Sequence, residues 1–75
     1  MITIHVHDDN SIWFNKQKIP IKQLTFLLQD AKKRYPGITP QLYHDRKASF
    51  GTYQSIKNAA ERAGFDEIDV ILKPA

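Results

Sequence analysis

The second half of the chain constrains the fold most strongly, because it reads as a strand, a helix and a strand in succession. Residues 38–44 favour a strand with Leu42 as its expected core residue, residues 50–63 favour an amphipathic helix, and residues 68–72 favour a final strand. Two strands that are joined through one helix run parallel, with a right-handed crossover. The sequence therefore predicts a βαβ unit in this half.

The helix of this unit has clear start and stop signals. Ser49 is the expected N-cap, because its hydroxyl can accept a hydrogen bond from the amide of Gly51 or Thr52. Gly64 stands where a left-handed residue ends a helix, and Phe65 is expected to fold back on the last turn in a Schellman arrangement. The helix is expected to bury one stripe of side chains: Phe50, Tyr53, Ile56, Ala60 and Ala63.

The first half predicts a β-hairpin. Residues 2–7 alternate between apolar and polar side chains, which is typical of a half-buried strand. Residues 8–11 are a cluster of short polar side chains that favours a turn. Residues 12–14 form a short second strand, which is expected to end at Asn15.

A helix follows the hairpin. Pro20 interrupts the strand ladder, residues 21–35 have helical periodicity, and Pro36-Gly37 terminates the helix. The helix is expected to present one apolar stripe: Ile21, Leu24, Leu27, Leu28, Ala31 and Tyr35.

Together these elements predict an α+β fold, namely a single mixed sheet with two helices packed on one face, in the order β-β-α-β-α-β. The 75 residues allow one domain, which spans residues 1–75. The absence of cysteine excludes disulfides and thiolate zinc sites. A second subunit is therefore the simplest source of additional stability for so small a core.

The spacing of apolar, turn and charged positions is the basis of a family resemblance. The positions that match the family keep one register without a gap from residue 45 to residue 72, and the match is looser before residue 45. The matching residues are Asn10, Ile12, Phe14, Asn15, Ile19, Leu24, Leu27, Leu28, Asp45, Arg46, Phe50, Ile56, Ala63, Gly64, Phe65, Ile68 and Val70. In this spacing the chain resembles the periplasmic domain of the ExbD/TolR family of inner-membrane energy-transduction proteins. His44 stands where a small residue is common in the family, and Asn58 stands where many members have an aspartate. These departures leave open whether the chain is nearer ExbD or TolR.

The resemblance implies a component of a proton-driven motor that powers outer-membrane transport. Members of the family form dimers threaded through an ExbB- or TolQ-like membrane channel protein, and an aspartate in their transmembrane helix couples proton flow to movement. Their periplasmic domain engages a TonB- or TolA-like protein, or peptidoglycan. We therefore expect the periplasmic domain of a single-pass inner-membrane protein, with the transmembrane helix ahead of an added Met1.

The expected contact surface is the final strand, with Ile68, Val70, Ile71 and Leu72. Ile71 is apolar where alternation calls for a polar residue, which indicates that the second face of this strand is also covered. An exposed sheet edge offers unpaired backbone groups to an extended peptide. We therefore expect this edge to receive a second copy of the chain or a segment of the TonB-like partner.

The histidines allow a metal site as an alternative. His5 and His7 project from one face of the first strand and would need His44, Asp8 or Asp9 as a further ligand. No such third ligand has a defined spacing, so we expect neither a metal nor a cofactor.

Nucleic-acid binding by a small basic module is the alternative function. The net charge is +3, and residues 32–34 together with Arg46 and Lys47 would form a basic patch. Trp13 is the only obvious residue for base stacking, and we expect residues 32–34 to be a solvated helix end. Asp45 beside Arg46 allows partner recognition, but local anchoring near the helix N-terminus is the favoured interpretation.

An enzymatic function is not expected. The sequence has no cysteine nucleophile, no glycine-rich phosphate loop and no pair of carboxylates at a defined spacing. We therefore assign no catalytic residue.

Overall fold

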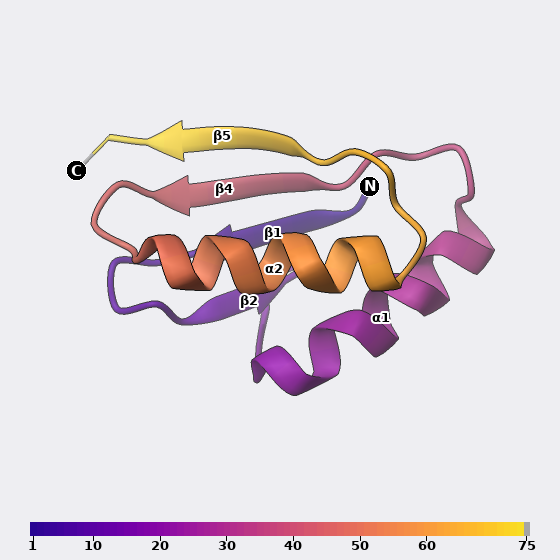
Figure 1. Cartoon of the computed structure of the whole chain (residues 1–75), viewed down its shortest axis with the longest axis horizontal. Coiled ribbons are helices and arrows are strands. Elements are labelled where there is room, and N and C mark those ends of the chain that lie inside the picture. The colour runs from indigo at the N-terminus through magenta and orange to yellow at the C-terminus, as the bar shows by residue number, and fades with distance from the viewer. Residues whose placement is uncertain (75) are drawn as a thin grey trace.

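The computed structural model describes residues 1–74, which form five strands and two helices (Figure 1). The strands form one sheet in the order β3-β2-β1-β4-β5, in which the β1–β2 and β2–β3 pairs are antiparallel and the β1–β4 and β4–β5 pairs are parallel. The predicted α+β class is confirmed, as is the parallel pairing within the βαβ unit. The elements are β1 (Thr3–Val6), β2 (Ile12–Phe14), β3 (Gln17–Ile19), α1 (Ile21–Arg34), β4 (Gln41–Asp45), α2 (Phe50–Arg62) and β5 (Asp69–Lys73).

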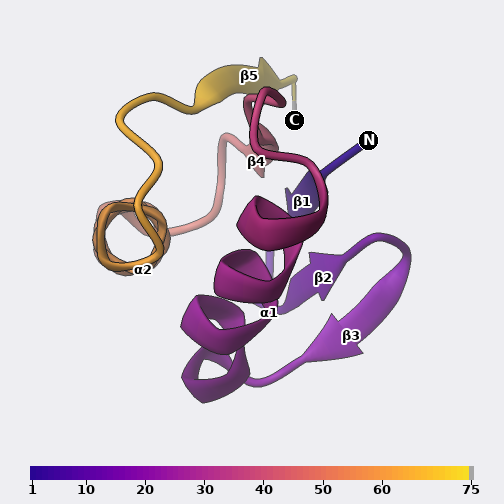
Figure 2. The same ribbon diagram turned by 90° about the vertical axis from the view of Figure 1, so that its right-hand side faces the viewer.

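Both helices lie on the same side of the sheet, as predicted, and β5 forms one rim of it (Figure 2). The other side of the sheet carries no helix within residues 1–74, so it is an open face. Among the same residues, no helix is both long enough and apolar enough to cross a membrane.

Strand β3 was not predicted. It follows β2 through a two-residue turn at Asn15 and Lys16, whose φ angles are 46° and 74°. Such positive angles at both turn residues are what a tight hairpin needs. Asn15 is a common residue there, but a lysine at positive φ is not, and the strand itself has only Ile19 as a buried residue. The element order is therefore β-β-β-α-β-α-β.

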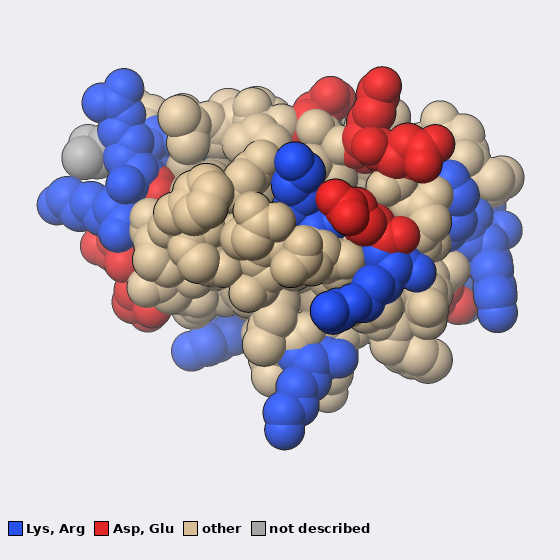
Figure 3. Space-filling view, in the orientation of Figure 1, with Lys and Arg blue, Asp and Glu red and all other residues tan. Residues whose placement is uncertain are grey.

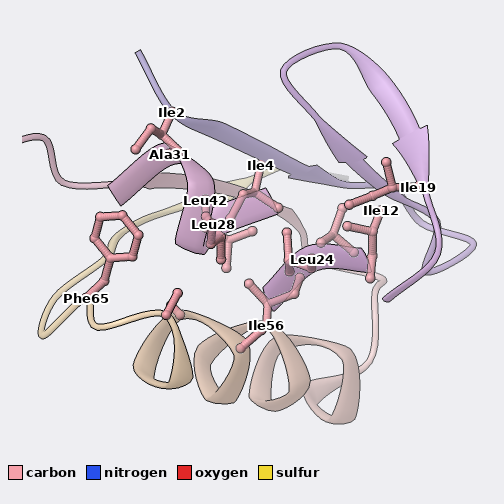
Figure 4. Packing of buried hydrophobic residues seen from close by; sticks show 14 residues of the cluster. Ile2, Ile4, Ile12, Ile19, Leu24, Leu28, Ala31, Leu42, Ile56 and Phe65 are labelled. Atoms are coloured by element: carbon pink, nitrogen blue, oxygen red, sulfur yellow. The ribbon is translucent and has the colours of Figure 1, made fainter. Parts of the chain in front are cut away.

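The core lies between the helix-covered face of the sheet and the two helices, whose side chains point toward one another in Figure 4. Leu42 is fully buried, as predicted, and β1 supplies two buried residues, Ile4 and Val6, on the same face. The buried hydrophobic residues are Ile2, Ile4, Val6, Ile12, Ile19, Leu24, Leu28, Ala31, Leu42, Ile56, Ala59, Ala60, Ala63 and Phe65.

The buried stripe of each helix is narrower than the sequence predicted. Ile21 at the start of α1 is 40% exposed, and Tyr35, just after the end of α1, is 48% exposed. In α2, the predicted core residue Phe50 is 74% exposed, whereas Ala59, which was not predicted, is buried. A small sheet covers only the middle of each helix, so apolar residues in the first and last turns extend beyond it.

Helix α2 begins and ends as predicted. The Ser49 hydroxyl accepts a hydrogen bond from the Thr52 amide at 3.1 Å. At the other end Gly64 has a φ of 95°, and the amides of Phe65 and Gly64 donate to the carbonyls of Ala60 and Glu61, both at 3.0 Å. This pair of bonds is the Schellman motif.

The first hairpin is tied to the start of α2 by one side chain. The side-chain oxygen Oδ1 of Asn10 accepts hydrogen bonds from the Ser49 amide at 2.8 Å and from the Thr52 hydroxyl at 2.9 Å. Asn10 itself has a φ of 68°, which an asparagine tolerates in a turn. The predicted turn cluster therefore also fixes where α2 starts.

Replacing Gly64 with alanine is expected to destabilise the domain by about 1 kcal/mol, because an alanine at positive φ is strained. The measurement is the free energy of unfolding from denaturant titration. Gly51→Ala is the matched control, since Gly51 lies in α2 and an added Cβ would meet only the Ser49 hydroxyl at 3.8 Å. Gly51→Ala should leave stability equal or raise it by about 0.5 kcal/mol. Equal effects of the two changes would contradict the assignment of Gly64 as a strained C′ position.

Candidate functional site

Strand β5 is an exposed edge of the sheet along its whole length. All five of its residues are exposed, including Val70, Ile71 and Leu72 at 41%, 38% and 61%. The other edge, β3, has three residues and carries Lys18 at its centre. Short strands and lysines protect an edge from pairing, whereas a longer apolar edge invites it. The structure therefore leaves β5 as the edge that is open to another strand.

The two faces of β5 have different neighbours. Val70 and Leu72 lie beside Leu42 and His44 of β4, on the helix-covered side of the sheet. Ile71 lies beside Tyr43 and therefore projects to the open face, as its place in the sequence predicted. Ile68, the fourth predicted contact residue, precedes β5 and packs against the core.

The backbone of β5 directs alternate residues toward β4 and toward solvent. The Asp69 amide donates to the Pro40 carbonyl at 2.9 Å, and the Lys73 carbonyl accepts from the Arg46 amide at 3.2 Å. Because alternate residues of a strand direct their backbone groups to opposite sides, Val70 and Leu72 point their N–H and C=O groups away from β4. These are the groups that an added strand would pair with.

A groove of about 390 Å³ runs beside this edge, between β4, β5 and the start of α2. Its walls are mostly apolar, and the charged residue that lines it is Arg46. The size is within the range of pockets that accept a small ligand or a side chain. The lining residues are His44, Arg46, Ala48, Phe50, Tyr53, Val70 and Leu72.

His44 forms the most unusual part of this groove. The residue is only 5% exposed, and its Nδ1 atom is buried without a hydrogen-bond partner. Its ring meets the Tyr53 ring edge-on, with 5.9 Å between centroids. A buried polar atom without a partner costs free energy, so a position that only filled space would be better served by an aliphatic side chain.

The Asp45–Arg46 pair is held by a local turn. The Asp45 carboxylate accepts from the Lys47 amide at 2.8 Å, and its carbonyl accepts from the Ala48 amide at 3.0 Å. These contacts are the local anchoring that we favoured for Asp45, although they stabilise the turn before α2 rather than the helix N-terminus itself. The turn leaves the Arg46 side chain to line the groove.

The open face of the sheet carries a row of side chains that cross all five strands at one level. The registers place Lys18 beside Trp13, Trp13 beside His5, His5 beside Tyr43, and Tyr43 beside Ile71. The His5 and Tyr43 rings stack with 4.7 Å between centroids. The sequence did not suggest this row, because its members come from five separate strands.

Two further residues extend the row. His7 stacks on Trp13 with 5.2 Å between ring centroids. The Lys73 ammonium lies 5.7 Å from the centroid of the Tyr43 ring and 3.4 Å from His5 Nδ1. Burial, then the charge of Lys73, and then that of His7 lower the pKa of His5 below its ordinary value of 6.5.

The structure does not assemble the metal site that the histidines allowed. His5 projects to the open face, whereas His44 lies beside Val6 and Leu72 on the helix-covered side. Within residues 1–74, no three side chains of the histidine, cysteine, aspartate and glutamate types lie close enough together to hold a metal ion.

The basic patch expected for nucleic-acid binding is also not assembled. Residues 32–34 lie in the last turn of α1, at the opposite end of the molecule from Arg46 and Lys47 (Figure 1). Arg34 forms an ion pair with Asp30 at 3.1 Å, and the Lys32 ammonium lies 4.8 Å from the centre of the Phe65 ring.

No protein-family model matches the chain, and no curated protein matches it.

The stability of the domain is expected to fall as the pH is lowered through 6.5. The pKa of His5 is lower in the folded state than in the unfolded state, so the unfolded chain binds the proton first. The contribution of neutral His5 to the free energy of unfolding is therefore present above pH 6.5, and it is lost as the pH falls toward the lower pKa of His5 in the folded state. Unfolding free energies at pH 7.5 and pH 5.0 measure the effect. The variant His5→Gln should show a smaller fall than the wild type, and an equal fall would assign the pH dependence to other groups.

Replacing His44 with leucine is expected to raise the free energy of unfolding by about 1 kcal/mol, because it removes a buried nitrogen that has no partner. The measurement is a denaturant titration of the isolated domain. His7→Leu, on the exposed side of the turn after β1, is the control and should change stability by less than about 0.5 kcal/mol. A lower free energy of unfolding in the His44→Leu variant would show that His44 stabilises the fold and is not kept only for its place in the groove.

Proposed function

We propose that this chain is a docking domain of the ExbD/TolR type, which captures an extended segment of a TonB- or TolA-like protein along β5. The observation that carries the proposal is the edge itself: a five-residue strand with three apolar residues and with outward-facing backbone groups at Val70 and Leu72. Strand addition supplies affinity through backbone hydrogen bonds, and pockets for alternate side chains supply selectivity. The groove beside β5 is the pocket in this proposal.

The groove indicates which side chain of the partner it would take. A strand added to β5 would send alternate side chains to the helix-covered side, next to Val70 and Leu72. There the apolar walls favour an aliphatic or aromatic side chain, and Arg46 favours a neighbouring carboxylate.

The wider role follows from the family resemblance. In that role the domain is periplasmic, a transmembrane helix joins it to an ExbB- or TolQ-like channel protein, and proton flow through that complex drives transport at the outer membrane. The element order from β3 to β5, which is β-α-β-α-β, supports this proposal, since the periplasmic domains of the family have this order after their first two strands. Peptidoglycan is a further ligand that a cell-wall pull-down would detect.

Binding of single-stranded nucleic acid is the second candidate, and the row on the open face is the observation that favours it. Trp13 and Tyr43 lie on one face with Lys18 and Lys73 near them. However, the Tyr43 ring is stacked on His5, and the Lys73 ammonium lies next to both rings, so a base would have to displace His5 to stack on that face of Tyr43. Such binding would weaken steeply with added salt, whereas strand addition would not.

Replacing Ile71 with lysine is expected to weaken binding of the periplasmic region of a TonB- or TolA-type protein about tenfold while leaving the fold intact, because Ile71 lies on the binding edge but outside the core. An NMR titration would measure both affinity and the site, since the amides of Val70 and Leu72 should shift first. Lys18→Glu on the opposite edge is the control and should bind like the wild type. Shifts centred on Trp13 and Tyr43, or unchanged affinity of Ile71→Lys, would reject docking at β5.

A further inference from the structure

The side chain of the last residue of β5 reaches across the neighbouring strand. The Lys73 ammonium lies on the open face, 5.7 Å from the centroid of the Tyr43 ring on β4 and 3.4 Å from His5 Nδ1 on β1. His5 is itself stacked on Tyr43, with 4.7 Å between the ring centroids and 11° between the ring planes. The end of β5 is therefore fastened to β1 by one side chain that passes over β4.

The contact between Lys73 and His5 requires a neutral imidazole. An ammonium group donates hydrogen bonds and cannot accept them, so Nδ1 has to be the acceptor and the ring proton has to lie on Nε2. A second proton on the ring would remove this acceptor and place two positive charges side by side. Burial and then the charge of Lys73 lower the pKa of His5, in agreement with this contact.

The other charged groups near His5 do not reverse this effect. The titratable residues on this face of the sheet and in the turn after β1 are His7, Asp8, Asp9, Lys18, Tyr43, Asp45, Asp69 and Lys73. The charges that shift the pKa of His5 are those of Lys73 and His7, and both lower it. The carboxylates of Asp9 and Asp45 accept hydrogen bonds from the backbone amides two residues further on, at 2.9 Å and 2.8 Å.

Lys73 also makes the last backbone hydrogen bond between β4 and β5. Its carbonyl accepts from the Arg46 amide at 3.2 Å, whereas at the other end of the pair the Asp69 amide donates to Pro40 at 2.9 Å. Leu72, whose backbone groups face outward, is the preceding residue. Without the contact to His5, the end of β5 would be held by this one bond and would open more often, as strand ends with few contacts do.

The end of β5 lies in a basic part of the molecule. Figure 3 shows Lys and Arg side chains gathered at the upper left, where β4 and β5 end. Arg46 and Lys47 follow β4 there, and Lys73 is the last residue of β5. A positive charge gained by His5 would be added to this basic end and would drive the Lys73 ammonium into solvent.

We infer that Lys73 and His5 form a latch that holds the end of β5 in place, and that a proton on His5 opens the latch and weakens capture of the partner segment. The inference rests on the proposed function and adds regulation of the same edge. An added strand must pair with the backbone of Leu72, and ordering a frayed strand end costs conformational entropy. Capture is therefore strongest near neutral pH and weaker where the surroundings of the domain become acidic.

Hydrogen exchange at the two ends of the β4–β5 pair tests the latch without the partner. The protection factor of the Arg46 amide, which is corrected for the intrinsic exchange rate at each pH, should fall about threefold as His5 titrates, the size expected of one partly exposed charge contact. The midpoint of the His5 titration is read from its ring signals by NMR. The Asp69 amide at the far end is the internal control and should keep its protection.

Three variants separate the latch from other effects of pH. In His5→Gln the side-chain oxygen can accept from Lys73 at every pH, so the protection of the Arg46 amide should not change between pH 7.5 and pH 5.0. Lys73→Met removes the ammonium and should give at pH 7.5 the low protection that the wild type has at pH 5.0. His7→Gln is the matched control, because His7 stacks on Trp13 outside the latch, and it should respond to pH as the wild type does.

The affinity for the periplasmic region of a TonB- or TolA-type protein should fall about threefold more in the wild type than in His5→Gln between pH 7.5 and pH 5.0. Titration of the partner itself affects both chains equally and cancels in this comparison. The inference is overturned if the Arg46 and Asp69 amides lose protection together, if His5→Gln responds to pH like the wild type, or if both chains lose affinity equally. A latch that opens with His5, in a domain that binds no such region at either pH, would reject the proposed function alone.

Discussion

The packing of two helices against one face of a five-stranded sheet determines the rest of the structure. The helices meet the sheet over β1 and β4, where Ile4 and Leu42 are fully buried. The same packing leaves the rim incomplete, because Val70 and Leu72 on β5 face the helix side without being covered. The stable centre and the open edge thus have one cause, which is that two short helices cannot span the full width of the sheet.

Local signals in the sequence predicted the parts of the fold that depend on local chemistry. Ser49 and Gly64 limit α2 because a hydroxyl acceptor and a left-handed residue are needed at those two points whatever lies around them. Strand β3 was missed because its hairpin turn uses Lys16 at positive φ, a choice that tertiary pairing with β2 imposes. Phe50 was placed in the core wrongly, since helical periodicity shows which face is apolar but not how far the sheet extends beneath it.

The candidate site could be predicted only in part for a related reason. The break in alternation at Ile71 is visible in the sequence, and the structure places this apolar residue on the open face. The groove is formed by residues from β4, β5 and α2, and the row on the open face by residues from five strands. Their proximity depends on strand order and register, which single-sequence periodicity does not contain. The missing partner of His44 is likewise a property of the packed structure.

The parallel pairing of β4 with β5 has a mechanical consequence. Five residues of β5 lie in register with five residues of β4, from Gln41 opposite Asp69 to Asp45 opposite Lys73. A pull directed along β5 would load all the hydrogen bonds of this ladder together, in shear, instead of opening them one after another from an end. An edge of this geometry is suited to bearing tension passed along an extended chain, and it would transmit that tension directly into the centre of the sheet.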